Sequence, residues 1–103
     1  MKNLQQQVLL FCEKNKLLNN SVMRFLDLVS EIGELSKEFL IQSDYGDVKP
    51  LAVSKDVEQE IGDILFSLIC LSNAVNIDLE NALNAVLEKY QKRIDVKNNS
   101  GSL

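Results

Sequence analysis

Residues 56–75, DVEQEIGDILFSLICLSNAV, decide the fold of this chain of 103 residues. Drawn as a helix, the stretch is apolar around nearly its whole circumference, and a helix of that kind is buried. Its apolar part, residues 61–75, is about 15 residues long and contains Asp63, whereas a membrane-spanning helix needs about 20 residues. The stretch therefore predicts the core helix of a globular protein with no membrane partner.

A single polar stripe runs along this helix and carries Asp56, Glu60, Asp63 and Ser67. A carboxylate in apolar surroundings costs several kcal/mol unless it is paired, or else it takes up a proton. The sequence contains no lysine or arginine from residue 56 to residue 88. The neutralising charge must therefore come from a metal ion or from another segment.

The segment EIGEL at residues 31–35 is nearly repeated by EIGDI at residues 60–64. In each segment two acidic residues stand three positions apart and therefore share one helix face. Two such helices side by side would gather four carboxylates, and like charges that close need a cation. Because the chain has no histidine, oxygen alone would hold the ion, which favours Mg²⁺ or Mn²⁺ over Zn²⁺ or Cu²⁺.

Each acidic pair encloses a glycine, Gly33 or Gly62. A glycine inside a helix costs roughly 1 kcal/mol relative to alanine. Two glycines at matching places suggest that a neighbouring helix or a ligand needs the space. The acids of the earlier helix fall in one narrow sector of its surface together with one cation: Arg24, Asp27, Glu31, Glu34 and Glu38.

The helical period dominates the whole chain, and proline and glycine are scarce. We therefore predict a single all-α domain, a four-helix bundle formed by residues 1–94. Candidate N-caps are Asn19, Asn20 or Ser21 for the second helix, Ser54 or Asp56 for the third, and Asp78 for the fourth. The predicted helices span residues 4–15, 22–41, 54 or 56 to 75, and 79–93, with a loop at 43–53 and a polar tail at 95–103 that we expect to fray.

The composition narrows the partners and the compartment. Eleven basic against fifteen acidic residues give a net charge of −4, which argues against a nucleic-acid partner because such proteins need a basic surface. Cys12 and Cys70 lie in apolar surroundings without the spacing of a metal pair, so we expect buried free thiols in a reducing cytosol. The first ten residues are polar and mixed, unlike a signal peptide, which also favours a cytoplasmic protein.

An all-carboxylate site suits a substrate rich in phosphate, because Mg²⁺ keeps open positions for water and phosphate oxygens. We therefore expect hydrolysis at phosphorus, with the metal neutralising the phosphates and activating a bound water. A ferritin-like di-iron site is disfavoured because it needs histidine. Cations near the end of the last helix would either clamp substrate phosphates or complement the helix dipole, and both interpretations stay open: Lys89, Lys92 and Arg93.

The motifs resemble a known family. The strings LVSEIGEL at residues 28–35, QEIGDILF at residues 59–66 and NIDLENA at residues 76–82 are similar to those of the MazG family of all-α nucleoside triphosphate pyrophosphatases. The acidic pairs, separated by 25 residues, resemble the signature of that family. The resemblance covers roughly residues 4–93.

The resemblance implies an enzyme that uses Mg²⁺, or Mn²⁺, to split ribo- or deoxyribonucleoside triphosphates into the monophosphate and pyrophosphate, with water attacking the α-phosphorus. Such enzymes control or sanitise nucleotide pools. It also implies that helix packing makes the protein a homodimer or homotetramer, in which Lys89 and Arg93 contact phosphates, including across a subunit boundary. The implied metal ligands are Glu31, Glu34, Glu60 and Asp63, with Glu38 as a further ligand or as the base that orients water.

Two positions depart from the family pattern, since Ser30 and Gln59 stand where many members carry an additional acid. This departure leaves a second hypothesis open, a non-catalytic MazG-like module that binds a nucleotide or a partner protein. A third hypothesis is a structural dimerisation bundle in which the acids pair with Lys89, Lys92 and Arg93.

Overall fold

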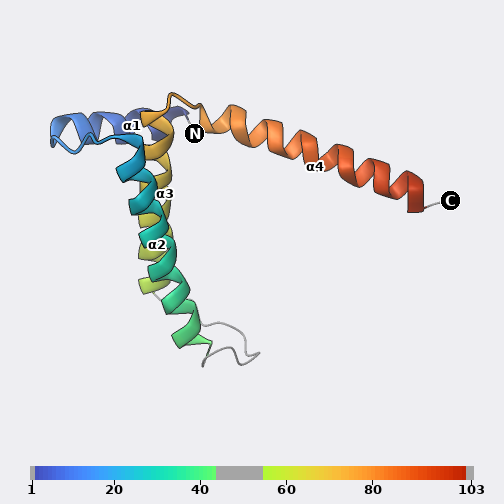
Figure 1. Cartoon of the computed structure of the whole chain (residues 1–103), viewed down its shortest axis with the longest axis horizontal. Helices are drawn as coiled ribbons and strands as arrows, with labels where there is room; N and C mark the ends of the chain where they lie inside the picture. Colours follow the sequence, from blue (N-terminus) through green and yellow to red (C-terminus); the bar gives the residue numbers. More distant parts are fainter. Residues whose placement is uncertain (1, 44–54, 102–103) are drawn as a thin grey trace.

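The computed structural model describes residues 2–43 and 55–101, and this part of the chain is entirely helical apart from its turns. Its four helices are α1 (Lys2–Lys14), α2 (Ser21–Gln42), α3 (Lys55–Ala74) and α4 (Leu79–Gly101), shown in Figure 1. The all-α prediction is confirmed, and the predicted helix ends agree within two residues except at the end of α4. Ser54 and the predicted loop beyond Ser43 lie outside the described residues.

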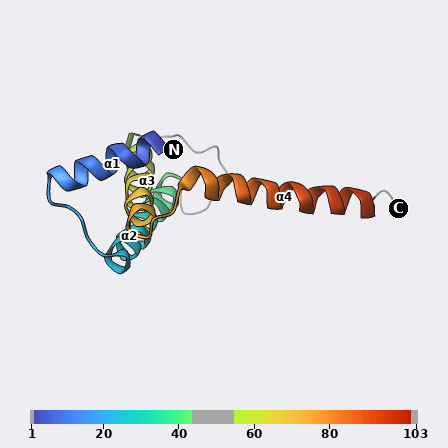
Figure 2. The same cartoon turned by 90° about the horizontal axis from the view of Figure 1, so that it is seen from above.

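The centre of the molecule is a hairpin in which α2 and α3 run antiparallel and side by side (Figures 1 and 2). Asn20, one of the three predicted caps, begins α2, because its side chain accepts a hydrogen bond of 2.9 Å from the backbone nitrogen of Met23. Capping of this kind satisfies a donor at the helix start that has no partner within the helix. The hairpin is therefore fixed at its upper end by local chemistry that the sequence predicted.

The first helix lies against α3 and completes a small core. The buried apolar side chains of the described chain are Cys12 from α1 and Val57, Ile69 and Cys70 from α3. Beside them, the ring of Phe11 packs edge-on against Phe66 with centroids 6.1 Å apart, a favourable aromatic geometry. The packing buries the side of α3 that the apolar run marked as core.

The turn between α3 and α4 sets the direction of the last helix. Asn76 adopts a left-handed backbone conformation with φ 58°, and the Ile77 nitrogen donates to the Ser72 carbonyl at 2.9 Å, which closes α3. Asp78 then begins α4 by accepting a hydrogen bond of 3.0 Å from the Asn81 nitrogen, as predicted. The two helices meet at 101°.

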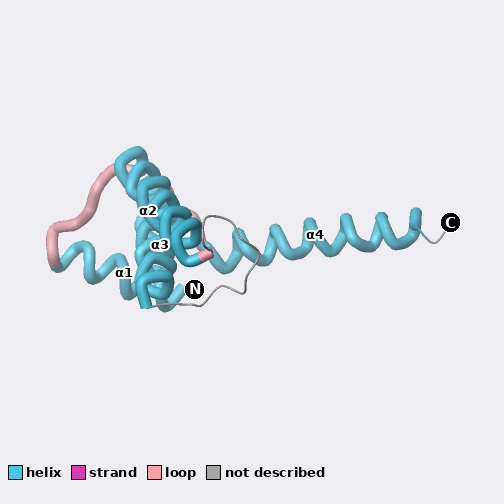
Figure 3. The backbone as a smooth tube through the Cα atoms, turned by 90° about the horizontal axis from the view of Figure 1, so that it is seen from below, coloured by secondary structure: helices cyan, strands magenta, loops and turns pink. Residues whose placement is uncertain are grey.

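After this bend, α4 projects away from the hairpin as a single long helix (Figures 1 and 3). A single chain therefore does not form the predicted four-helix bundle, because the sequence period gives the length of a helix but not the angle at which it leaves a turn. In the described residues, no helix taken alone is long and apolar enough to cross a membrane, and α3 and α4 pass that test only as a bent pair.

A glutamine near the start of the chain holds the base of α4. The side chain of Gln5 donates to the Ile77 carbonyl at 2.8 Å and accepts from the Leu79 nitrogen at 2.9 Å. The Gln5 side-chain amide also donates to the Asn73 side-chain oxygen at 3.2 Å, and the Asn73 amide donates to the backbone carbonyl of Gln5 at 3.1 Å. One side chain therefore links α1, the end of α3 and the start of α4.

The fourth helix continues to Gly101, beyond the predicted helix end at residue 93, and the frayed tail stays a prediction. The polar side chains there support the helix by bonding along it. Gln91 donates to Asp95 at 2.9 Å, a spacing of four residues that places both on one helix face.

Much of the apolar surface of the helices is exposed in a single chain. Phe25 of α2 is 53% exposed, Ile32 is 50% exposed and Leu87 of α4 is 55% exposed. The expectation that α3 is buried nearly all round is wrong for one chain, because α1 and α2 cover only part of its circumference and leave Ile61 52% exposed. Large exposed apolar patches mark surfaces that meet another protein, and the predicted dimer or tetramer stays a prediction.

Candidate metal centre

The hairpin brings acids from its two helices together. Glu31 of α2 lies opposite Glu60 and Asp63 of α3, and each offers a carboxylate oxygen that lies within 4.8 Å of the other two. Glu31 and Glu60 are half-buried, and Asp63 is exposed. The antiparallel packing therefore brings together three of the four carboxylates that the matching acidic pairs predicted.

Glu60 is the least satisfied member of this group. Its Oε2 atom is buried and has no hydrogen-bond partner among the described residues. Partial burial raises the pKa of the Glu60 carboxyl, and the charges of Glu31, Asp63, Glu34 and Glu38 raise it further, in that order. A carboxylate with negatively charged neighbours and an unpaired buried oxygen has the environment expected of a metal ligand.

The size of the group suits a hard divalent ion. Opposite oxygens around Mg²⁺ lie about 4.2 Å apart, twice a ligand distance of about 2.1 Å. The three carboxylate oxygens already lie within 4.8 Å of one another, so small side-chain rotations would bring them to ligand distance. An all-oxygen set matches Mg²⁺ or Mn²⁺ rather than softer ions, and the residues therefore fit the metal that the sequence predicted.

The two remaining predicted acids lie at the edge of this group. Glu34, predicted as the fourth ligand, is exposed and is not part of the close set, although its charge reaches Glu60. Glu38 is half-buried and accepts a hydrogen bond from the Gln42 amide at 3.4 Å. The ligand roles of all four acids and the role of Glu38 stay predictions.

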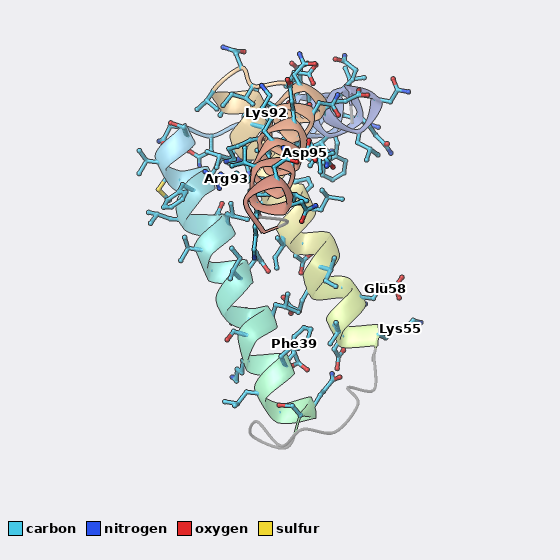
Figure 4. All side chains as sticks on the ribbon, turned by 90° about the vertical axis from the view of Figure 1, so that its right-hand side faces the viewer. Phe39, Lys55, Glu58, Lys92, Arg93 and Asp95 are labelled. Atoms are coloured by element: carbon cyan, nitrogen blue, oxygen red, sulfur yellow. The ribbon has the colours of Figure 1, made fainter. Side chains whose placement is uncertain are left out.

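The predicted phosphate contacts lie elsewhere in the chain. Lys89, Lys92 and Arg93 are on α4, whose main contacts are with α1 and which leads away from the hairpin (Figures 1 and 4). In the described residues this cluster forms a local ion pair, between Lys92 and Glu88 at 3.4 Å. Within one chain these cations therefore do not neutralise the acids of α2 and α3.

Arg24, the buried cation of α2, is also held by a partner outside the acidic group. Arg24 is buried, and its guanidinium donates to the carbonyl of Leu17 in the connection between α1 and α2. On α4, Lys89 and Arg93 both lie over the Tyr90 ring, with the Lys89 nitrogen 5.1 Å and the Arg93 guanidinium carbon 5.9 Å from its centroid. These three cations are held by a carbonyl and by an aromatic ring.

The two glycines are not required by close packing in a single chain. A Cβ atom added at Gly33 or Gly62 would meet no atom within 4 Å among the described neighbours. The predicted neighbouring helix is therefore not α2, α3 or another described element of the same chain. A ligand or a second chain stays the predicted reason for the space.

The polar contacts between α1 and the rest of the molecule were not predicted from the sequence. Gln5 and Asn73 are 68 residues apart, and so no local spacing could reveal their paired hydrogen bonds. The contact between Cys12 and Cys70 was missed for the same reason. Only the placement of both residues on apolar helix faces hinted that they meet.

Comparison with known proteins identifies the family. The family model of the MazG nucleotide pyrophosphohydrolase domain matches the sequence of residues 21–96. This range includes α2, α3 and most of α4. The gathered acids lie within it. The resemblance predicted from the motifs is therefore confirmed.

Two relatives are similar in sequence over part of their length. The uncharacterized protein YpjD from Bacillus subtilis (strain 168) is 42% identical over 69 residues, which are 64% of this chain and 60% of YpjD. The nucleoside triphosphate pyrophosphohydrolase/pyrophosphatase MazG from Thermotoga maritima is 34% identical over 53 residues, which are 52% of this chain and 21% of that protein. The match thus spans less than two thirds of either relative.

Two crystal structures share the fold over most of the chain. The Bacillus-conserved MazG protein, a nucleotide pyrophosphohydrolase, superposes with a TM-score of 0.71 and 32% identity, covering 86% of each chain. The YPJD protein from Bacillus subtilis superposes with a TM-score of 0.73 and 35% identity, covering 90% of this chain and 94% of that one. Coverage this high extends the likeness beyond the hairpin.

Proposed function

Because the chain belongs to the MazG nucleotide pyrophosphohydrolase domain family, we propose that it is a Mg²⁺-dependent nucleoside triphosphate pyrophosphohydrolase. The substrates are ribo- or deoxyribonucleoside triphosphates, and the products are the monophosphate and pyrophosphate. The observation that carries the proposal is the group formed by Glu31, Glu60 and Asp63, whose carboxylate oxygens lie within 4.8 Å of one another, together with the Oε2 atom of Glu60, which is buried and unpaired in the described part of the chain. Mn²⁺ would serve in place of Mg²⁺ because it takes the same oxygen ligands.

In this proposal Glu31, Glu60 and Asp63 hold the metal, and Glu34 joins them by a side-chain rotation from the next turn of α2. When bound, the ion supplies neutralisation of the phosphate charge and a water of lowered pKa. Glu38 lies one turn beyond Glu34 on the same side of α2, and its carboxylate would orient the attacking water or take up its proton. Attack at the α-phosphorus then releases pyrophosphate.

The phosphates also need cations from the protein. Lys89, Lys92 and Arg93 lie on the projecting α4, so we propose that they reach the acidic group of a second copy of the chain in a homodimer or homotetramer. The exposed apolar side chains of α2 and α4 support such an assembly. This arrangement would place one chain's cations beside the other chain's metal.

The test is pyrophosphate release from a panel of ordinary and modified nucleoside triphosphates, measured with Mg²⁺, with Mn²⁺ and with chelator. We expect release only with a divalent ion. Glu60→Gln should lower kcat by more than about 100-fold, because it removes a ligand whose charge the metal needs.

Glu58→Gln is the matched control, because Glu58 is exposed on the outer side of α3 (Figure 4) and the change removes the same charge two residues away. Its activity should equal that of the unmodified protein. Full activity of Glu60→Gln, or turnover in chelator, would rule out the proposed site.

The departures at Ser30 and Gln59 favour a second candidate function, a non-catalytic module that binds a nucleotide or a partner protein. Both residues are exposed, and neither adds a carboxylate to the group. Saturable nucleotide binding by calorimetry, without turnover of any member of the panel, would support this function in place of the first.

A further inference from the structure

The core between α1 and α3 contains a pair of thiols in contact. Cys12 and Cys70 are 2% and 5% exposed, are both free, and come from different helices. Their sulfur atoms lie 3.7 Å apart, although the residues are 58 positions apart in the chain. The contact does not involve the acidic group, and its chemistry is independent of the proposed function.

The pair also borders a cavity. A space of about 70 Å³ is lined by both cysteines together with Leu9, Arg24 and Asn73. A disulfide needs its sulfur atoms about 2.05 Å apart, so each sulfur must move by less than an ångström from the observed contact. The cavity gives the side chains room for that rotation.

We propose that Cys12 and Cys70 form a redox-modifiable dithiol, which a low-molecular-weight disulfide of the glutathione class converts into an intramolecular disulfide. The alternative for two buried thiols is permanent packing as small apolar groups. Their mutual contact across two helices distinguishes this pair from isolated buried cysteines, because a bond between them requires little change in the fold.

The reaction consumes one small disulfide for each protein bond. One cysteine sulfur, as thiolate, attacks a sulfur of the small disulfide, and the expelled thiolate takes up the released proton. The second cysteine then attacks the mixed disulfide, forms the bond between the two cysteine sulfurs and expels the second small thiol. Two electrons pass from the cysteine sulfurs to the small disulfide, which leaves as two thiols.

The environment makes this exchange slow and selective. The pKa of the Cys70 thiol is raised to about 11, mainly by burial. The hydrogen bond with Cys12 also raises this pKa, and its effect is larger than the opposite effect of the Arg24 charge. Cys70 is therefore almost entirely protonated at neutral pH, which disfavours reaction at that sulfur with chance oxidants.

The bond would tie together the part of the fold that orients α4. Cys12 lies two helical turns beyond Gln5 on α1, and Gln5 holds the turn between α3 and α4. A covalent link from α1 to α3 therefore fixes the helix that braces the base of α4. It also closes a loop of 58 residues, which constrains the unfolded chain.

The experiment equilibrates the full chain with graded ratios of oxidised to reduced glutathione for many hours, with and without urea. Alkylation in acid traps the thiols, and mass spectrometry of unreduced peptides locates the bond. We expect a link between Cys12 and Cys70 within one chain. The effective concentration of the two thiols relative to each other should be at least about 30-fold higher in the folded protein than in urea. This ratio corresponds to a typical stabilisation by a disulfide.

The oxidised protein should also melt at least about 8 °C higher than the reduced protein. Cys12→Ser and Cys70→Ser are matched controls that should each give only mixed disulfides with glutathione. If either fails to fold, the comparison of unmodified protein with and without urea still decides the question. Thiols that stay reduced when folded, links between chains, or a bond no more favourable than in urea would each overturn the proposal.

Discussion

The hairpin of α2 and α3 carries the acids of the candidate site, and the projecting α4 carries the cations. Packing between two helices positions the acids, whereas the turn before α4 sets the position of the cations. The hairpin gathers Glu31, Glu60 and Asp63 within a single chain. The cations Lys89, Lys92 and Arg93 lie on a helix whose direction depends on one bend and whose apolar residues are exposed. The packed helices bring their acids together within one chain, whereas most of α4 projects away from its own hairpin (Figure 1), and its cations serve a second copy of the chain only in our proposal.

The strongest test of this comparison begins with the removal of one cation from α4. Arg93→Ala should lower kcat/KM by about 10- to 100-fold, because it removes a charged contact to phosphate. Lys55→Ala, which removes a charge from the outer side of α3 (Figure 4), should have little effect. Steady-state kinetics on purified proteins measure both.

If α4 acts across a subunit boundary, co-refolding Arg93→Ala with Glu60→Gln should restore activity well above either variant alone. Each hybrid then contains one site that has an intact acidic group and an intact Arg93. No recovery, with hybrids shown to form by differential tagging, would mean that α4 does not serve a partner's site.

Magnesium binding tests the hairpin without any reference to α4. At a concentration about 100 times its dissociation constant, Mg²⁺ should stabilise the protein by about 2.7 kcal/mol, because it binds the folded state alone. Thermal denaturation with and without chelator measures the effect. Glu60→Gln should abolish the stabilisation while Arg93→Ala and Glu58→Gln keep it, and an unchanged melting temperature in all proteins would count against the site.

The packing of α1 on the hairpin should make stability fall at alkaline pH. The pKa of Cys70 rises from 9.0 to about 11 on folding, so the unfolded chain loses this proton first. The stability that the raised pKa contributes is fully present below pH 9 and is lost as the pH rises through about 11, which lowers the free energy of unfolding by about 3 kcal/mol. Urea denaturation of the reduced protein should show a steeper alkaline decline than Cys70→Ala, and equal slopes would contradict the assignment.

The smallest expected effect concerns the glycine within the second acidic pair. Gly62→Ala should stabilise α3 by about 1 kcal/mol, since the added methyl group meets no atom of the described chain within 4 Å. Gly33→Ala gives the matching measurement on α2. A gain in stability together with a loss of nucleotide turnover would assign the space to a ligand or a second chain, whereas unchanged turnover would remove that role.

Prediction from sequence succeeded where local patterns carry the information. The period of residues 56–75 indicated α3, and the side chains of Asn20 and Asp78 marked the starts of α2 and α4. It failed for the end of α4, because polar residues after Arg93 resemble a frayed tail although hydrogen bonds such as that from Gln91 to Asp95 support the helix. The prediction of a four-helix bundle failed because a turn and the Gln5 side chain set the bend of 101° between α3 and α4. The spacing of residues along the sequence does not encode such an angle.

The amino-acid order alone determined that acids recur in matching pairs on two amphipathic helices, because helical periodicity converts spacing into faces. Only the tertiary structure decided which carboxylates meet, that Glu34 lies outside the close group, and that Cys12 contacts Cys70. Contacts between distant residues depend on how helices dock and on the angles of the turns between them. Those angles arise from many weak interactions acting together, and no single stretch of sequence contains them.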